Sequence, residues 1–212
     1  MTSVATALAG RTFEELIRTE APTLAAGVGA LVDMAMFWKA AGQHRHFASS
    51  DEFDRQMTDR YSAIYPAVHS ERLQPASTPE PTLAEQHLGM ILLLDQYPRN
   101  AFRGSPKQFQ SDPIARKWAD IAIQHGSDTK VDPALRLFFY LPYSHSENID
   151  DHNKAVQLGQ QLGEPFLGFA KEHRDVIARF GRYCHRNKVL GRQTTDEERH
   201  FLENDAPAWA KA

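Results

Sequence analysis

Apolar side chains recur along this chain at helical intervals. Two segments carry them on a single stripe: Phe53, Met57, Tyr61, Ile64 and Tyr65 in the first, and Phe166, Phe169, Ile177 and Phe180 in the second. This spacing is typical of amphipathic helices that cover a core. No segment alternates apolar and polar residues convincingly, as a half-buried strand does. The pattern therefore predicts an all-helical protein.

One segment is apolar all round. Residues Leu88 to Leu94 contain no charged side chain, which predicts a central helix buried on every side. We expect this helix to stop before Pro98, because a proline disfavours the helical conformation in the residue in front of it. Leu137 to Leu141 is a second buried segment, and the Asp132-Pro133 pair ahead of it favours a short helix.

Helix-start chemistry recurs along the chain. A Ser or Thr followed three residues later by Glu predicts a capping box, in which the two side chains satisfy each other's backbone amides. An Asp-Pro pair also predicts a helix start, because Asp accepts hydrogen bonds from the first backbone amides and Pro tolerates the first helical position. The six candidate starts are Ser49/Glu52, Thr82/Glu85, Ser144/Glu147, Thr195/Glu198, Asp112-Pro113 and Asp132-Pro133. They predict a single all-α domain of about seven to nine helices, paired as antiparallel hairpins around Leu88 to Leu94.

Composition narrows the class of protein. The hydrophobic share of 42% and the charged share of 24% are those of a globular chain. The 24 Lys and Arg residues do not outnumber the 27 Asp and Glu residues, so we expect no nucleic-acid partner. The longest apolar stretch, Leu24 to Trp38, is interrupted by Asp33 and too short to cross a bilayer, so we expect no membrane partner. A single cysteine, Cys184, and the lack of a visible secretory signal predict a cytoplasmic protein.

Two polar segments far apart in the sequence resemble each other. Tyr97 to Gly104 and Tyr183 to Arg192 each follow an apolar helical run and combine Tyr, Arg, Asn and Gly. The first opens a stretch from Pro98 to Ser111 that is long for a loop in a compact domain, and such loops are usually functional or packed by their own side chains. Five arginines lie in or beside the two segments: Arg99, Arg103, Arg182, Arg186 and Arg192.

These arginines admit two interpretations. Several guanidinium groups on facing loops make a receptor for carboxylate or phosphate, which they bind in a bidentate manner. Alternatively, a cation near the end of a helix is stabilised by the helix dipole, and Asn100 or Asn187 can supply the left-handed residue that ends a helix. Arg99 and Arg186 then only hold helical hairpins together by pairing with carboxylates of the chain: Asp95, Glu147 or Glu197.

The triplet His145-Ser146-Glu147 is the best candidate for acid–base chemistry. An imidazole beside a carboxylate can move a proton near neutral pH, although Ser144 and Glu147 also fit a capping box. Other histidines and carboxylates nearby suggest a metal site, but their spacing matches no ligand motif, so we predict neither a metal ion nor a cofactor. The residues concerned are His145, Glu147, Asp151, His152, His173 and His185. Cys184 is a further candidate, since its positive neighbours favour a thiolate.

Three groups of motifs carry a resemblance to a known family: Leu94-Asp95-Gln96-Tyr97-Pro98-Arg99-Asn100 with Phe102-Arg103-Gly104, Tyr140-Leu141-Pro142 with His145-Ser146-Glu147, and Phe180-Gly181-Arg182 with His185-Arg186-Asn187 and Leu190-Gly191-Arg192. The resemblance spans roughly Phe37 to Leu202. The chain resembles the uncharacterised domain-of-unknown-function family nine-two-four, from bacteria and eukaryotes. This implies an all-helical fold akin to tetratricopeptide-like hairpins, and no established activity. It also implies a family-like domain over residues 36–212 after a helical extension over residues 1–35, with Cys184 and His152 in place of the family's usual Pro and frequent Gln.

We predict that the two arginine-bearing segments and the turn at His145 converge on one polar pocket, which binds a small anionic metabolite or an acidic peptide end. The ligand-binding residues would be Asp95, Gln96, Arg99, Asn100, Arg103, Arg182, His185, Arg186, Asn187 and Arg192. Two alternatives stay open. One is a hydrolytic or proton-transfer enzyme that uses His145 and Glu147, with arginines clamping the substrate. The other is a helical scaffold in which every arginine is satisfied within the protein.

Overall fold

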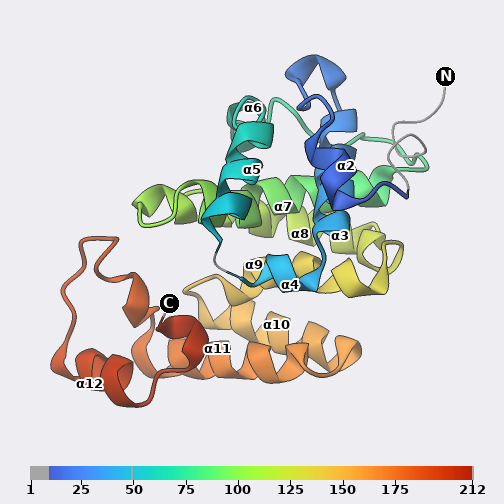
Figure 1. Ribbon diagram of the computed structural model, residues 1–212. Coiled ribbons are helices and arrows are strands. Elements are labelled where there is room, and N and C mark those ends of the chain that lie inside the picture. The colour runs from blue at the N-terminus through green and yellow to red at the C-terminus, as the bar shows by residue number, and fades with distance from the viewer. Residues whose placement is uncertain (1–9, 49, 212) are drawn as a thin grey trace. The chain divides into compact units, whose positions relative to one another are not determined.

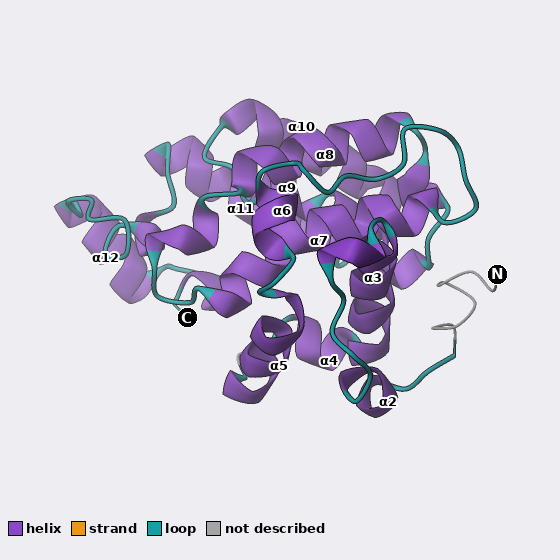
Figure 2. Cartoon of the chain, turned by 90° about the horizontal axis from the view of Figure 1, so that it is seen from above, coloured by secondary structure: helices purple, strands orange, loops and turns teal. Residues whose placement is uncertain are grey.

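The computed structural model describes residues 10–48 and 50–211, and this part of the chain consists of helices and loops without strands (Figure 1, Figure 2). The chain divides into two compact units. Of the described residues, those from 10 to 103 together with 107–142 form the first unit, and residues 104–106 together with 143–211 form the second. Seven of the α-helices in the described residues have nine or more residues each, and the others are about one turn long. The prediction of an all-α fold is confirmed.

The first unit is built around α7 (Leu83–Ala101), which contacts α3 (Gly29–Ala41), α5 (Asp51–Tyr61), α6 (Tyr65–His69) and α8 (Asp112–Gln124). Shorter elements complete it: α2 (Phe13–Ile17), η1 (Leu24–Ala26), α4 (Gln43–His46), η3 (Ser127–Thr129) and η4 (Pro133–Phe139). Two further short elements, η2 (Pro106–Phe109) and α9 (Leu141–Ser144), include residues of both units. Every residue from Leu88 to Leu94 is buried, which confirms the predicted central helix.

α3 and α7 pack backbone against backbone at a glycine. A Cβ atom at Gly89 would lie 1.9 Å from the carbonyl oxygen of Leu31, far inside van der Waals contact. Only the absence of a side chain allows this approach, so the packing depends on a glycine that the sequence shows merely as a gap in an apolar run. The first predicted stripe, from Phe53 to Tyr65, is buried as expected.

Pro98 corrects one prediction, because α7 continues through it to Ala101. A proline inside a helix has no N–H for the carbonyl four residues earlier, here that of Leu94. Ser111 replaces this donor: its Oγ donates to the Leu94 oxygen at 2.6 Å and accepts from the Tyr65 hydroxyl at 3.2 Å. The stretch from Pro98 to Ser111 is also not one long loop, since residues 98–101 belong to α7 and residues 106–109 to η2, with short turns at 102–105 and 110–111.

The predicted helix starts have mixed outcomes. The capping box of Thr195 and Glu198 is present, and Asp132 caps η4, which is a 3₁₀ helix. Thr82 precedes α7 without a side-chain cap, and Ser111 rather than Asp112 occupies the cap position of α8. The Ser144/Glu147 box is wrong, because Asn148 caps the following helix and Glu147 has other partners. Ser49 lies outside the described residues, and Ser50 caps α5.

The second unit contains a helical hairpin and a C-terminal helix. α10 (Ile149–Leu162) and α11 (Phe166–Phe180) are joined by three residues and lie side by side in Figures 1 and 2. A Cβ at Gly159 would lie 3.2 Å from the Leu167 Cα, so a glycine also allows this close packing. The long segment after α11 contains η5 (Cys184–Arg186) and leads to α12 (Asp196–Asn204) and η6 (Ala208–Ala210). The hydrophobic core of this unit includes Val176, Ile177, Tyr183 and Phe201.

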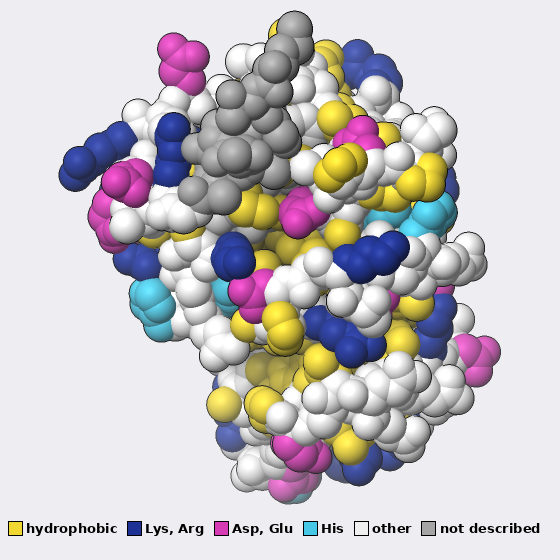
Figure 3. All heavy atoms as spheres, turned by 90° about the vertical axis from the view of Figure 1, so that its right-hand side faces the viewer, with side chains coloured by type: hydrophobic (Ala, Val, Ile, Leu, Met, Phe, Trp, Pro, Cys, Tyr) yellow, Lys and Arg dark blue, Asp and Glu magenta, His cyan; other side chains and the backbone are white. Residues whose placement is uncertain are grey.

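No helix among the described residues combines the length and apolar character that a bilayer crossing requires. On the surface visible in Figure 3, Lys and Arg side chains are interspersed with Asp and Glu, as the net charge of −3 suggests.

Candidate functional site

The two arginine-bearing segments belong to different units. In the first unit, residues 97–101 form the end of α7 and residues 102–103 follow it. In the second unit, residues 183–192 lie in the segment after α11. Their convergence on a shared pocket stays a prediction.

In the first unit, the arginines form ion pairs. Arg99 donates in a bidentate manner to Asp112, at 2.8 and 3.0 Å, and to the Asp95 carbonyl at 2.6 Å. These bonds connect the end of α7 with the start of α8. Arg103 makes a second bidentate pair with Asp54 of α5, at 2.7 and 3.0 Å. Both arginines therefore stabilise helix packing, whatever else they bind.

The remaining predicted residues of this segment also bond locally. Asp95 is buried and accepts from the Gln96 side-chain amide at 2.6 Å. Asn100 lies inside α7, where its side chain donates to the Gln96 carbonyl at 2.9 Å. Asn100 thus does not supply the left-handed residue that ends the helix. Gly104, with φ of +78°, is the residue in this turn with a positive φ.

In the second unit, Glu147 and Arg192 anchor the segment after α11. Arg192 donates to the two Glu147 oxygens at 2.6 and 3.0 Å, and the Tyr183 amide donates to Glu147 at 2.9 Å. Arg192 also donates to the Tyr183 carbonyl and to Asn187 Oδ1, both at 2.9 Å. Burial raises the pKa of Glu147, but the bonds from Arg192 and the Tyr183 amide outweigh it, so the pKa ends below its usual value.

Glu198 is the second anchor of this segment. It accepts from Arg182 at 2.6 and 2.9 Å, from Asn187 at 3.2 Å and from the Thr195 amide at 2.8 Å. The Arg182 guanidinium is the main reason why the pKa of Glu198 falls to about 2, against the opposing effect of burial. We call these five residues the anchor network: Glu147, Arg182, Asn187, Arg192 and Glu198.

Aromatic and basic side chains surround Tyr183. The Arg186 guanidinium carbon lies 4.3 Å from the Tyr183 ring centroid, and the His185 and Trp209 ring centroids lie 5.3 and 5.8 Å from it. His173 stacks on Trp209 with a centroid separation of 3.7 Å. We call this group the Tyr183 cluster: His173, Tyr183, His185, Arg186 and Trp209. Tyr183 and Trp209 are not among the site residues predicted from the sequence. The position of Tyr183 at the start of a repeated motif is the one sequence signal that points to it, and Trp209 has none.

The two histidines of the Tyr183 cluster are neutral at physiological pH. Burial lowers the pKa of His173 to about 3, and burial followed by the charge of Arg186 lowers that of His185 to about 4. His173 bonds the Phe169 carbonyl through Nδ1, so this nitrogen carries the hydrogen and Nε2 is left as an acceptor. His152 likewise bonds the Ser146 carbonyl through Nε2, and burial lowers its pKa.

The surroundings of Ser146 and Cys184 limit what these two side chains can do. Ser146 donates to Asp151 at 2.5 Å and accepts from the Asn148 amide, so its hydroxyl is engaged in the turn before α10. Burial raises the pKa of the Cys184 thiol to about 12, which is opposite to the shift suggested by its positive sequence neighbours. Among the described residues, no group of three His, Cys, Asp or Glu side chains is arranged to hold a metal ion.

Comparisons with known proteins agree with the motifs. The sequence model of a family described as "Bacterial protein of unknown function (DUF924)" matches residues 34–206. A solved structure of a protein of unknown function from Agrobacterium tumefaciens is 43% identical, with a TM-score of 0.76, and the match covers 82% of this chain and 96% of that one. No match was found among functionally curated proteins.

Proposed function

Since this chain belongs to the DUF924 family of bacterial proteins of unknown function, we propose a function from its geometry alone: it binds a small anionic metabolite, or the acidic end of a peptide, at the Tyr183 cluster. Arg186 and His185 would contact the ligand, and His173 and Trp209 would form the wall beside them. The hairpin of α10 and α11 would position this wall, much as helical hairpins do in tetratricopeptide-like proteins. A cytoplasmic setting is part of the same proposal.

His185 is the observation that carries this proposal. Its imidazole is half-buried between Tyr183 and Trp209, with ring centroids 5.3 and 5.7 Å away, and it makes no hydrogen bond to any described residue. A half-buried polar ring that makes no hydrogen bond within the described part of the chain is suited to bind a ligand, since a neutral imidazole can donate through one nitrogen and accept through the other. The neighbouring Arg186 guanidinium matches a carboxylate or phosphate.

The anchor network has a positioning role in this proposal. Arg182, Arg192 and Asn187 already bond carboxylates or amides of their own unit, so they hold the segment that presents His185 and Arg186. Ligand contacts by residues of the first unit, from Asp95 to Arg103, stay a prediction. Their ion pairs and local bonds support a structural role for them.

The two alternatives make different demands on the same residues. A hydrolytic or proton-transfer enzyme with His145 and Glu147 requires Glu147 to exchange protons, yet this carboxylate accepts three hydrogen bonds and has a lowered pKa. A helical scaffold requires only that the arginines be satisfied internally. The ion pairs of Arg99, Arg103, Arg182 and Arg192 support that reading. Ligand binding that depends on His185 and Arg186 separates our proposal from both.

Thermal-shift measurements with inorganic phosphate, citrate and succinate test the proposal, because a ligand that binds only the native state raises the melting temperature. We expect at least one of these anions to stabilise the wild type, and His185→Ala and Arg186→Gln to lose this response. Matched controls are His200→Ala and Arg199→Gln on exposed positions of α12, which should respond as the wild type does. If no anion stabilises the wild type, or if both site variants still respond, the proposal is wrong.

A further inference from the structure

A groove of about 370 Å³ lies in the second unit, on the side of α11 and α12. Its apolar lining comes from Val176 and Phe180 of α11, Phe201 of α12 and Pro207 after it. Val176 and Phe201 belong to the core of the unit and Phe180 packs against it, so the groove is a place where the core reaches the surface. Its volume is at the lower end of the range for ligand pockets.

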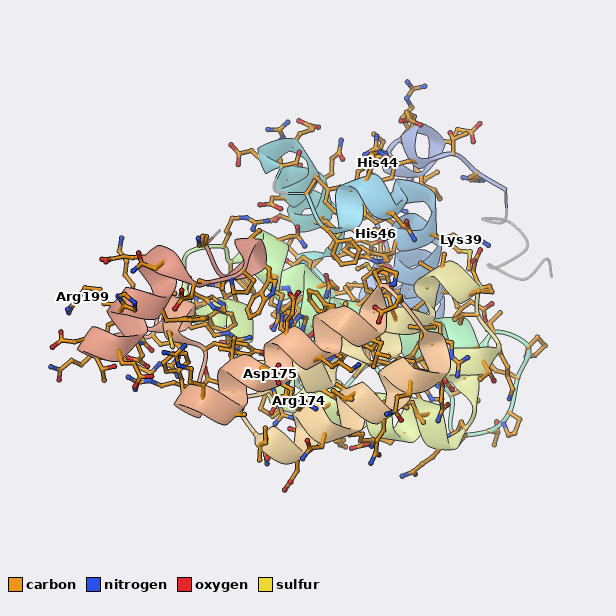
Figure 4. All side chains as sticks on the ribbon, turned by 90° about the horizontal axis from the view of Figure 1, so that it is seen from below. Lys39, His44, His46, Arg174, Asp175 and Arg199 are labelled. Atoms are coloured by element: carbon orange, nitrogen blue, oxygen red, sulfur yellow. The ribbon has the colours of Figure 1, made fainter. Side chains whose placement is uncertain are left out.

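The charged lining of the groove is mainly acidic. It consists of Glu172, Asp175 and Asp205 against a single cation, Arg179. Arg179 is itself paired with Glu197, at 3.0 Å, and Asp175 with the neighbouring Arg174 on the exposed side of α11 (Figure 4). The groove therefore presents an apolar floor with a negative rim, opposite in sign to the proposed anion site.

We propose that this groove is a docking site for a basic peptide segment of a partner protein, in which a Lys or Arg is flanked by an apolar residue. The apolar side chain would pack on Phe180 and Phe201, and the cation would lie among the carboxylates of the rim. The Arg179 guanidinium carbon lies 4.7 Å from the Phe180 ring centroid and 5.6 Å from that of Phe201, so a cation already lies beside this apolar floor.

One side chain connects the groove with a spectroscopic reporter. Trp209 donates through Nε1 to the Glu172 carboxylate at 3.3 Å, and Glu172 lines the groove. A cation that engages Glu172 therefore changes the surroundings of the Trp209 indole. Its fluorescence should report occupation of the groove.

Peptide titrations test the proposal. The probe is the hexapeptide acetyl-Gly-Leu-Lys-Leu-Lys-Gly-amide, followed by Trp fluorescence and by NMR of the ¹⁵N-labelled full chain, with the Glu-for-Lys peptide as its counterpart. We expect the Lys peptide to bind, with shifts at the amides of Val176, Phe180 and Phe201, and the Glu peptide not to bind. Asp205→Asn and Asp175→Asn should each weaken binding by up to about fivefold, as expected for exposed ion pairs.

Glu203→Gln is the matched control. It removes the same charge from an exposed position of α12 that does not line the groove, so it should leave the affinity unchanged. Equal weakening by Glu203→Gln would mean attraction to net charge alone and would overturn the proposal. Failure of the Lys peptide to bind, or shifts confined to other residues, would overturn it too. Trp209 also belongs to the Tyr183 cluster, so the NMR shifts at Val176, Phe180 and Phe201, and not the fluorescence alone, assign binding to the groove. Anion binding at the Tyr183 cluster has its own test, the response of His185→Ala and Arg186→Gln to anions.

Discussion

The carbonyl of Leu94 illustrates how much a single residue can decide. Pro98 has no N–H to donate to this carbonyl. The hydroxyl of Ser111, seventeen residues after Leu94, donates in its place. From the sequence alone the proline predicts the end of a helix, because the replacement donor is distant in the chain and no local pattern reveals it. Glu147 is a similar case. Its sequence neighbours predict a catalytic or capping residue, whereas its main partner in the structure, Arg192, lies 45 residues away in the chain.

Ser111→Ala should destabilise the protein by about 1–3 kcal/mol, because it leaves the buried Leu94 carbonyl without a donor. Pro98→Ala restores the backbone N–H, so the same Ser111→Ala change should cost clearly less in a Pro98→Ala background. Urea denaturation of the four proteins in this double-mutant cycle measures the coupling. Equal costs in both backgrounds would show that the hydroxyl does not act through the proline.

At the scale of elements, two glycines set how closely helices pack. Gly89 brings the backbone of α7 against that of α3, and Gly159 brings α10 against α11. The apolar stripes predicted from the sequence identify which faces are buried, but they do not say how near the partner backbone comes. That distance depends on the partner, which the pattern of one helix cannot reveal.

Gly89→Ala should therefore lower the free energy of unfolding by more than the cost of about 1–3 kcal/mol that is typical of an overpacked core. This loss is expected even though alanine favours helix formation. The added Cβ would meet the rigid carbonyl of Leu31 and force the helices apart. Gly168→Ala in α11 is the matched control, since its nearest neighbour is the movable end of the Glu164 side chain. Denaturant unfolding should show the control to be as stable as the wild type or more so. A mild effect of Gly89→Ala would contradict the close packing.

Over the whole molecule, burial keeps histidines of both units neutral. The pKa falls to about 4 for His46, His87 and His185 and to about 3 for His173, in each case mainly through burial. An unfolded histidine has a pKa of about 6.5. Between pH 6.5 and 4 the unfolded chain thus binds more protons than the native one, and stability must fall as the pH falls.

We expect the free energy of unfolding to drop by up to about 1.4 kcal/mol per pH unit for each such histidine in this window. The loss from His46, His87 and His185 should end near pH 4, whereas that from His173 should continue to about pH 3. His173→Gln should reduce the slope, whereas His200→Gln, at an exposed position, should not. Chemical denaturation at a series of pH values measures both slopes. A stability that is flat from pH 6.5 to 4 would show that these imidazoles are not held neutral.

The sequence by itself determined the helical class, the buried stripes, the central helix and the capping box of Thr195 and Glu198, because these depend on periodicity and on contacts three or four residues apart. Only the tertiary structure decided that α7 runs through Pro98, that Arg99 pairs with Asp112 and Arg192 with Glu147, and that Tyr183 has Trp209 beside it. A guanidinium or an aromatic ring carries the same chemistry whichever partner it meets. The choice of partner is made by the packing of elements that are distant in the chain.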